Sequence, residues 1–436
     1  MLSKIESNKI LALLKKEVVP AIGCTEPMAV ALATAKATEL LGETPDMVIA
    51  HISANIIKNA MGVGIPGSEG MVGLPAAIAL AALAGKSEYS LEVLKDVNHE
   101  DVERAKAFIE SRKFMVIQAR DTQEILYVEI EARKDEKKSK VIIARNHTNF
   151  VYLQSPKAIL LDNRDMLNNT VASEHETSLT MAKVYEFATT VPLANLRFIL
   201  DSATMNKSVS QLAFSGDYGL NLGKSLLGGG FEQRMLGYTT MPKIVIYTCA
   251  ACDVRMSGAQ VPVMTNSGSG NQGIAATIPV VVFAEDTQAT ESKLIRALTL
   301  SHLTVIYIKQ LLGRLSAHCG CVIAATGSAC GITYLMGGDY NHVCYAIKNQ
   351  IAALTGMVCD GAKPSCSLKI SSAVSSAFQA ALLSMDNICV SSNDGIIEQD
   401  VDKSIRNLAD IGRDAMHEVD NIVLKIMVNK DNPSCE

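Results

Sequence analysis

The spacing of apolar and polar residues predicts how the first part of the chain folds. Residues 3–18 place apolar side chains at roughly helical spacing, which predicts an amphipathic helix that ends before Pro20. A tight turn at Gly23 leads into an alanine-rich stretch, which predicts a second helix up to Leu41 with Pro27 in its first turn. Two helices are therefore expected before the first strand.

Strand patterns follow these helices. Residues 47–57 predict a strand that runs into a loop, and residues 100–112 predict a charged helix. Three segments with alternating apolar and polar positions then continue to about residue 154. The charged run 133–140 lies between two of these segments and predicts an exposed hairpin turn. We therefore expect a small strand-rich unit at about residues 100–154.

The pattern changes again at Val254, where long apolar segments with many small residues predict closely packed helices. The pattern does not decide the form of the apolar run IVIYTCAA just before this point. The predicted fold class is α+β, with a small mixed α/β N-terminal part followed by a mostly α-helical C-terminal domain. We place the α+β part at residues 1–253 and the helical domain at residues 254–436.

Composition narrows the class of protein. The 436 residues are 48% hydrophobic and 19% charged, which is typical of a globular protein, and the net charge of −5 argues against a nucleic-acid-binding surface. The first twenty residues carry charges throughout and predict no secretion signal, so the odd number of cysteines, 11, favours the reducing cytoplasm. The twenty uncharged residues 319–338 are rich in small and polar side chains and predict a buried helix rather than a membrane span.

Candidate chemistry concentrates between residues 314 and 369. This stretch holds five cysteines, namely Cys319, Cys321, Cys330, Cys359 and Cys366. The run DGAKPS between the last two predicts a turn that lets both sulfurs face one point. Together with a thiolate from Cys319 or Cys321, this pair suits an iron–sulfur cluster in which one iron has no protein sulfur. Such an iron is a Lewis acid, which favours catalysis over electron transfer.

Other interpretations of the cysteines stay open on this evidence. Cys330 lies in the small-residue run ATGSACGI and is typical of a buried structural cysteine. A zinc site is a second alternative, although the close pair Cys249 and Cys252 has no second pair at zinc-finger spacing. Cys24 lies just before a predicted helix, where a helix N-terminus is expected to lower the pKa of a thiol. Its structural alternative is a plain capping turn.

Two polar, glycine-rich loops are further candidates. Residues 59–75 contain a literal GxGxxG, but Pro66 interrupts it and no acidic residue follows at the distance that dinucleotide binding requires. We interpret this loop as a cradle of backbone N–H groups for an anion or carboxylate, with a tight connection as the alternative. The segment TNSGSGNQG at 265–273 precedes an apolar helix, as expected for a carboxylate site at a helix N-terminus, with a flexible loop as the alternative.

These motifs together resemble a known family. GCTEPMAVALA, KNAMGVGIPG, MSGAQVPVMTNSGSGNQGI, RLSAHCGC and GMVCDGAKPSC resemble, in this order and over nearly the whole chain, the L-cysteine desulfidase family and, more distantly, the iron–sulfur L-serine dehydratases of bacteria. The resemblance implies a [4Fe–4S] lyase without pyridoxal phosphate that converts L-cysteine into pyruvate, ammonia and hydrogen sulfide. It also implies that residues 1–253 form the substrate-binding and catalytic part and that residues 254–436 form an iron–sulfur domain like that of the serine dehydratase alpha chain, in which Cys319, Cys359 and Cys366 hold the cluster. Cys321 is a rival for the position of Cys319, and Cys24 is either the catalytic base or a displaceable fourth ligand.

The departures from the dehydratase pattern favour the desulfidase branch. The dehydratases carry a serine-rich motif with a histidine in place of AIGCTEPM, and a longer turn between their last two cluster cysteines. The alternatives are an L-serine dehydratase and a non-catalytic metal-binding or cluster-binding protein. Expected partners are a small amino-acid substrate and a second copy in a homodimer, with neither nucleic acid nor membrane. The substrate-binding candidates are Thr25, Glu26, Gly64, Gly67, Asn266, Ser267, Gly268, Ser269 and Asn271.

Overall fold

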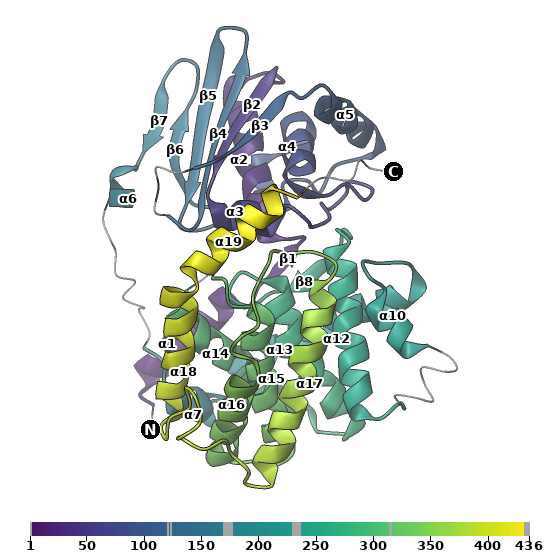
Figure 1. Ribbon diagram of the computed structural model, residues 1–436, viewed down its shortest axis with the longest axis vertical. Helices are drawn as coiled ribbons and strands as arrows, with labels where there is room; N and C mark the ends of the chain where they lie inside the picture. Colours follow the sequence, from purple (N-terminus) through teal and green to yellow (C-terminus); the bar gives the residue numbers. More distant parts are fainter. Residues whose placement is uncertain are drawn as a thin grey trace.

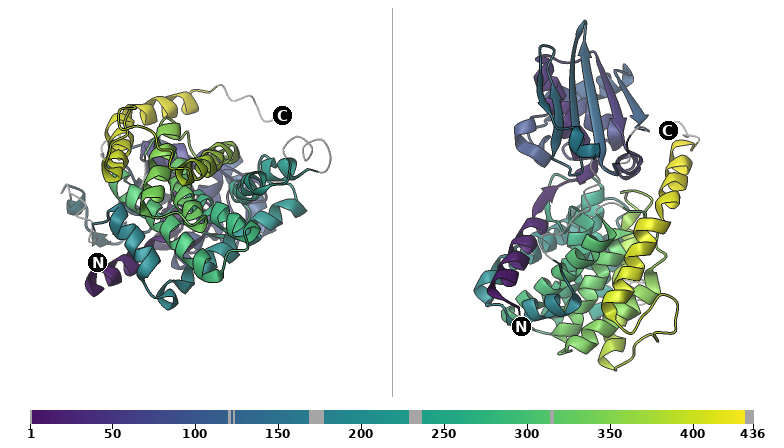
Figure 2. Two further views of the ribbon diagram at one scale, coloured as in Figure 1. Left: turned by 90° about the horizontal axis from the view of Figure 1, so that it is seen from below. Right: turned by 90° about the vertical axis from the view of Figure 1, so that its left-hand side faces the viewer.

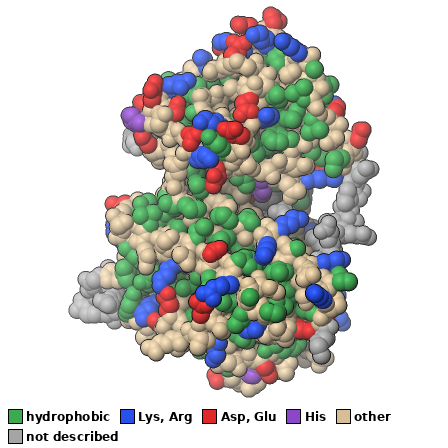
Figure 3. All heavy atoms as spheres, turned by 180° about the vertical axis from the view of Figure 1, so that it is seen from behind, with side chains coloured by type: hydrophobic (Ala, Val, Ile, Leu, Met, Phe, Trp, Pro, Cys, Tyr) green, Lys and Arg blue, Asp and Glu red, His purple; other side chains and the backbone are tan. Residues whose placement is uncertain are grey.

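The chain forms two units, an α/β unit and a helical unit, which are stacked along the long axis of the molecule (Figures 1 and 2). The computed structural model describes residues 2–119, 122, 124–168, 178–228, 237–313 and 316–430. Each unit has its own buried apolar cluster. Seen from behind, the molecule narrows where the units meet, and side chains of both charge signs are mixed over this face (Figure 3).

The α/β unit is built on one six-stranded sheet. The strands are β2 (Met47–Ile52), β3 (Phe114–Gln118), β4 (Tyr127–Lys134), β5 (Lys137–Ala144), β6 (Phe150–Gln154) and β7 (Ile159–Asp162). Their order in the sheet is β3-β2-β4-β5-β6-β7, in which β2 and β3 run parallel and the other pairs are antiparallel. Lys134 pairs with Lys137 at the end of the β4–β5 hairpin, which confirms the turn predicted from the charged run.

Helices pack on the sheet and on one another, and two of them are rich in alanine. These helices are α2 (Thr25–Leu41), α3 (Ala54–Ala60), α4 (Gly73–Ala84) and α5 (His99–Glu110). Helix α2 packs on β4 and β5, α4 packs on β3, and α5 packs on α4. Small side chains on α2 permit a close approach, since the Ser139 hydroxyl on β5 donates to the Ala37 carbonyl of α2 over 2.6 Å. The short elements η1 (Ser87–Glu92) and α6 (Asp165–Asn168) complete this unit.

The helical unit also contains the first helix and the first strand of the chain. Its elements are α1 (Lys4–Glu17), β1 (Pro20–Ile22), α7 (Met181–Thr190), α8 (Leu193–Leu196), η2 (Arg197–Ile199), α9 (Leu200–Leu212), η3 (Ala213–Ser215), α10 (Leu222–Leu227), α12 (Thr240–Met256), β8 (Pro262–Met264), α13 (Gly270–Asp286), α14 (Glu291–Leu312), α15 (Gly320–Leu335), α16 (Tyr340–Leu354), α17 (Cys366–Met385), α18 (Val401–Asp410) and η4 (Ile411–Ala415). The undecided run IVIYTCAA is part of α12. Ile10 and Leu14 of α1 are buried in the same core as the later helices.

Helix α15 lies at the centre of this unit, between α13, α14, α16 and α17. Its small residues make this possible: a side chain at Gly327 would overlap the Ser301 carbonyl of α14, and one at Gly331 would lie 3.0 Å from the Ala297 carbonyl. The prediction of a buried helix over the uncharged run is therefore confirmed. Among the described residues, we find none of the helices long and apolar enough to cross a membrane.

The predicted fold class is confirmed, because a sheet-containing N-terminal part precedes a mostly helical C-terminal part. The boundary at residues 253 and 254 stays a prediction, and the core of the helical unit contains side chains from both sides of it. Among the described residues, contacts at the junction and along the last helix join the units. Strand β1 pairs with β8 at their junction, and α19 (His417–Val428) crosses from the helical unit to α3, where Leu424 joins the α/β core (Figure 1).

Candidate active site

Helix N-termini from both units converge at the candidate site. Cys24 is the N-cap of α2, Cys319 is the N-cap of α15, and Cys366 is the first residue of α17. The N-cap of α13 is Ser269, whose hydroxyl accepts from the Gln272 N–H. The unpaired N–H groups of a helix N-terminus favour negative charge. Thiolates and carboxylates are therefore the groups that this junction suits.

The structure brings the three predicted cluster cysteines together. The backbone at Cys319 pairs with the backbone at Cys359, because the Cys319 N–H donates to Met357 over 2.9 Å and the Cys359 N–H donates to Ala317 over 2.6 Å. The following turn returns Cys366, whose N–H donates to the Lys363 carbonyl over 2.9 Å. The three thiols are close enough to interact electrostatically with one another.

Two further thiols lie beside this group. Cys321 donates to the Cys319 sulfur, and this hydrogen bond lowers the pKa of Cys319 to about 7 and raises that of Cys321. Cys252 on α12 interacts with both Cys321 and Cys366. From the sequence, Cys252 was considered only as a zinc ligand, and its position beside these thiols was missed. The sequence around Cys252 does not indicate which helices α12 packs against. Cys330 is elsewhere in the core, as the structural interpretation predicted, and donates to the Thr326 carbonyl.

Three lysines supply positive charge next to these thiols. Lys363 and Lys369 both pair with Asp360 in the turn between Cys359 and Cys366. Lys58 of α3 is 1% exposed and donates to the Cys359 carbonyl over 3.2 Å. Burial raises the pKa of the Cys359 thiol to about 11, and the charge of Lys58 opposes this shift. Sequence reasoning missed Lys58, since nothing in its local sequence shows that α3 meets this turn.

The environment of Cys24 differs from the expectation. Its thiol is fully buried, and burial raises its pKa to about 12, although the Arg255 side chain, which donates to its sulfur, acts in the opposite direction. The prediction that the pKa of Cys24 is lowered was therefore wrong. The cost of burying a thiolate away from water raises the pKa by more than a helix N-terminus lowers it. Cys24 nevertheless lies close to Cys366, so it belongs to the same site.

The GCTEP motif contacts the polar loop at 265–273. The Thr25 hydroxyl donates to the Gly268 carbonyl over 3.0 Å, and Arg255 joins the Gly23 carbonyl at 3.1 Å to the Asn271 side chain at 3.0 Å. Glu26 accepts from the Asn59 side chain over 3.2 Å. Arg255 and Asn59 are further residues that the sequence did not single out.

Within the polar loop, other predicted residues hold the loop itself. The Asn266 side chain donates to Nδ1 and to the carbonyl of His302 in α14, and the Ser267 hydroxyl donates to Asn266. Ser267 and Gly268 have positive φ angles of 49° and 80°, which set the tight turn before α13. Asn266 and Ser267 therefore position the loop, whereas Gly268 and Asn271 face the GCTEP motif.

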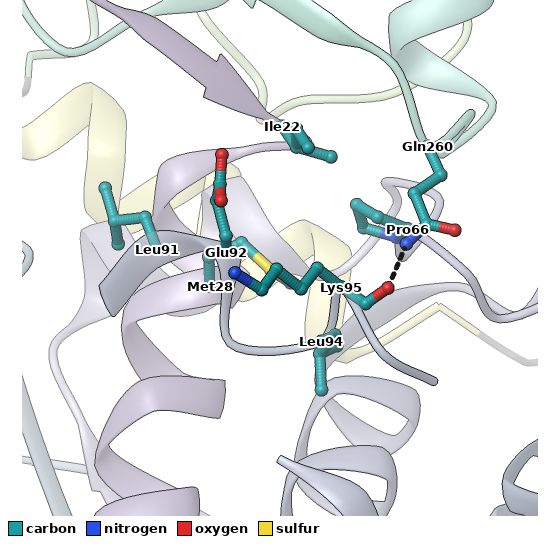
Figure 4. A pocket seen from close by; sticks show the side chains of 8 residues that line it. All are labelled: Ile22, Met28, Pro66, Leu91, Glu92, Leu94, Lys95 and Gln260. Atoms are coloured by element: carbon teal, nitrogen blue, oxygen red, sulfur yellow. Dashed lines mark hydrogen bonds between the residues drawn. The ribbon is translucent and has the colours of Figure 1, made fainter. Parts of the chain in front are cut away.

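The glycine-rich loop at 59–75 packs against the loop after α12. The Gly64 N–H donates to the Met256 carbonyl over 3.2 Å, so this amide is already used, and a side chain at Gly64 would overlap the Ser257 carbonyl. Gly67 has a φ of +72° and lies next to Gln260. A small cavity borders this loop, lined by Ile22, Met28, Pro66, Leu91, Glu92, Leu94, Lys95 and Gln260 (Figure 4). None of the predicted site residues lines it.

The chemistry of the donors fits an iron–sulfur cluster. Soft thiolate ligands favour such clusters, and the lysines and helix N-termini stabilise their negative charge. Within the described ranges, no three His, Cys, Asp or Glu side chains are close enough to hold one metal ion. The ligands of a cluster bind different irons and lie farther apart, so this finding concerns a single-ion site. Buried polar atoms without a partner, including Asn59 Oδ1, Arg255 Nε and Gln272 Oε1, also mark the junction.

Comparisons with known proteins show the family to which the chain belongs. Residues 88–425 match the family described as Serine dehydratase alpha chain. The chain is 56% identical to a UPF0597 protein of Phocaeicola vulgatus over 430 residues, which cover 99% of each chain. It is 55% identical to a UPF0597 protein of Bacteroides thetaiotaomicron over 98% of each chain, and 41% identical to one of Oleidesulfovibrio alaskensis over 98% of this chain and 99% of that protein. The names of these relatives give no substrate.

Proposed function

The chain belongs to the serine dehydratase alpha chain family, and we propose that it is a lyase that converts L-cysteine into pyruvate, ammonia and hydrogen sulfide. Family membership supports the lyase class. The observation that carries the proposal is the meeting of Cys319, Cys359 and Cys366 with the GCTEP motif at one junction. L-cysteine as substrate is the finer part of the proposal and rests on the resemblance of these motifs to the desulfidase family.

We propose that Cys319, Cys359 and Cys366 hold a [4Fe–4S] cluster. Cys319 is favoured over Cys321, because the Cys319 N–H donates to the Met357 carbonyl and so holds Cys319 beside the segment that carries Cys359, whereas Cys321 lies within α15. When bound, a cluster with one iron free of protein sulfur supplies a Lewis acid that makes the substrate's thiolate a better leaving group. The lysines around Cys359 and Cys366 balance the negative charge of the ligands.

The chain's own residues then serve the elimination. Cys24 Sγ, as a thiolate, takes the α-proton, the electron pair of that C–H bond forms the Cα–Cβ double bond, and the bond from Cβ to sulfur breaks with its pair on sulfur. Because burial raises the pKa of the Cys24 thiol to about 12, this thiol must first lose its proton to water, and Arg255 is the cation that favours the resulting thiolate. The aminoacrylate product tautomerises and hydrolyses in water to pyruvate and ammonia. Glu26 and the loop 265–271 position the substrate in this proposal.

The test is an assay under anaerobic conditions. The purified protein is analysed for iron and visible absorbance, and pyruvate and sulfide are measured after addition of L-cysteine or L-serine. We expect a brown protein that forms pyruvate and sulfide in equal amounts from L-cysteine. A colourless, iron-free protein that forms no pyruvate would refute the lyase and leave a non-catalytic role.

L-serine is the second candidate substrate, because the matching family is described as a serine dehydratase chain. Faster formation of pyruvate from L-serine than from L-cysteine would establish this alternative. Replacement of Cys24 with alanine separates its two proposed roles: a base is needed for turnover while the iron content stays, whereas a fourth ligand is needed to keep the iron. The cytoplasmic location and the homodimer stay predictions.

A further inference from the structure

Arg255 is a buried cation without a carboxylate partner among the described residues. Its side chain is 5% exposed, and its guanidinium lies over Gly270, where a side chain would come within 2.7 Å of Arg255 Cζ. The guanidinium donates to two carbonyl oxygens, those of Gly23 and of the Asn271 side chain, and to the Cys24 sulfur, while Nε has no partner. A buried guanidinium that lacks an anion is costly, and its planar donors match a carboxylate.

Two buried acceptor oxygens without partners belong to the same junction. Gln272 is 3% exposed, follows Asn271 on α13, and packs against Gly320, the first residue of α15, with Oε1 unpaired. Asn59 uses its amide nitrogen on Glu26 and leaves Oδ1 unpaired. The Glu26 carboxylate itself has no lysine or arginine partner among the described residues; it accepts from Thr25 and Asn59.

The contacts connect these groups in one continuous path. Asn59 bonds Glu26, and Glu26 is joined through Thr25 to the Gly268 carbonyl just before α13. Arg255 bonds the backbone two residues before Thr25, at Gly23, and the first turn of α13 at Asn271. The unpaired donor of Arg255 and the unpaired acceptor of Asn59 therefore both adjoin the GCTEP motif, and Gln272 follows Asn271 on α13.

We propose that this set recognises the two charged groups of an α-amino acid, with Arg255 binding the α-carboxylate and with Asn59, Gln272 and Glu26 binding the α-ammonium. The unpaired N–H donor of Arg255 matches the anionic carboxylate of the ligand. The two unpaired oxygens of Asn59 and Gln272, together with the Glu26 carboxylate, match the three N–H donors of its ammonium group. A ligand on these partners satisfies buried atoms that otherwise cost free energy. The assignment rests on the proposed function for its ligand class and deepens it by naming the residues that select the substrate.

The proposed carboxylate site also places the substrate next to Cys24. A carboxylate on Arg255 lies beside the Cys24 sulfur, because the same guanidinium contacts that sulfur. The Cα–H bond next to the carboxylate is then within reach of Cys24, which is the geometry that removal of the α-proton requires. Arg255 and Gln272 are binding residues in this account, and neither moves a proton.

The experiment measures binding of three unreactive probes to the purified protein by calorimetry. L-alanine carries both charged groups and no leaving group, propionate carries the carboxylate alone, and ethylamine carries the ammonium alone. We expect L-alanine to bind more tightly than either fragment. Arg255→Gln is expected to weaken L-alanine and propionate by about tenfold or more but to leave ethylamine unchanged, because a charged hydrogen bond is lost. Gln272→Met is expected to weaken L-alanine and ethylamine and to leave propionate unchanged.

Matched variants separate recognition from folding. Arg296→Gln is the control, because Arg296 also donates to two backbone carbonyls, those of Ala188 and Val191, far along the sequence from the junction. It is expected to leave all three affinities unchanged. Equal weakening of all three probes by Arg255→Gln would contradict the assignment, as would L-alanine that fails to bind the unsubstituted protein. Arg255→Lys restores the charge without the fork and is expected to recover part of the propionate affinity.

Failure of this inference is distinguishable from failure of the proposed function. Pyruvate formation from L-cysteine with unchanged L-alanine affinity in Arg255→Gln would overturn the assignment and leave the lyase intact. The expected pattern of probe affinities in a protein that forms no pyruvate would support the amino-acid site and overturn the lyase.

Discussion

The ion pair between Lys58 and Asp420 is predicted to fasten α19 across the site. The Lys58 side chain is 1% exposed, and the Asp420 side chain is 11% exposed. The Lys58 amine donates to Asp420 and, over 3.2 Å, to the Cys359 carbonyl, and Asn55 donates to the second oxygen of Asp420 over 2.9 Å. The pair therefore connects α3, α19 and the turn that carries a proposed cluster ligand.

The magnitude follows from the burial. Asp420→Asn leaves the Lys58 ammonium in the protein interior without a carboxylate partner among the described residues, because the Cys359 carbonyl and the new amide oxygen that can still accept its hydrogen bonds are both neutral. Loss of one partner of a buried pair costs about 3–5 kcal/mol, because the other charge loses its compensation. If this free energy holds α19 in place, the opening of α19 becomes at least about a hundredfold more frequent.

Hydrogen exchange of the α19 amides, followed by mass spectrometry, measures this opening. We expect exchange over residues 417–428 to accelerate in Asp420→Asn and to return toward the original rate in the double variant Lys58→Met/Asp420→Leu, in which no charge is stranded. Asp96→Asn is the control, since Asp96 and Lys86 form an exposed pair with side chains 45% and 50% exposed. Equal exchange rates in Asp420→Asn and the unsubstituted protein would refute the reasoning.

Three further predictions follow from single residues. Cys359→Ser is expected to lower the iron content of anaerobically purified protein sharply, whereas Cys330→Ser, in the core, is expected to keep it. Iron analysis measures both variants, and equal iron contents would contradict the ligand assignment. Gly64→Ala is expected to cost about 1–3 kcal/mol, because its methyl group overlaps the Ser257 carbonyl, and a lowered unfolding midpoint in urea checks this. Burial lowers the pKa of His302 from 6.5 to about 3, so the unfolded chain binds the extra proton between these values. Its contribution to stability is complete above about pH 6.5 and decreases toward pH 3, and urea midpoints against pH should show a shallower acid slope in His302→Gln.

The fold was predictable where one short stretch determines its own environment. The run 319–338 has no charges, and its many small and polar side chains disfavour a membrane span. The sequence therefore predicted a buried helix, and α15 is that helix. The charges at 133–140 predicted a turn between strands for the same local reason. The run at 244–251 was undecided because α12 is buried on nearly all sides, so its sequence has no helical period.

The site was predictable only in its motifs. Cys359 and Cys366 flank a turn whose residues are all local, so their proximity followed from the sequence. Lys58 and Cys252 join the site because α3 and α12 happen to pack there, which no local pattern reports. The pKa of Cys24 was wrong in direction because a helix N-terminus is visible in the sequence, whereas the depth of burial is set by the opposite unit.

The position of the family match bears on substrate choice. The match to the serine dehydratase alpha chain covers residues 88–425, and it therefore includes the turn with Cys359 and Cys366 but not Cys24. The proposed cluster ligands thus lie in the part that the family shares, whereas the GCTEP motif and Asn59 reach the site from outside it. If the matched region supplies the cluster that activates the leaving group, while Cys24 supplies the base from outside it, the residues that distinguish a thiol from a hydroxyl should be sought before residue 88. Substitutions around Cys24 are accordingly expected to change the ratio of kcat/KM for L-cysteine and L-serine more than substitutions of equal size around Cys252, which lies on the same site from within the matched region.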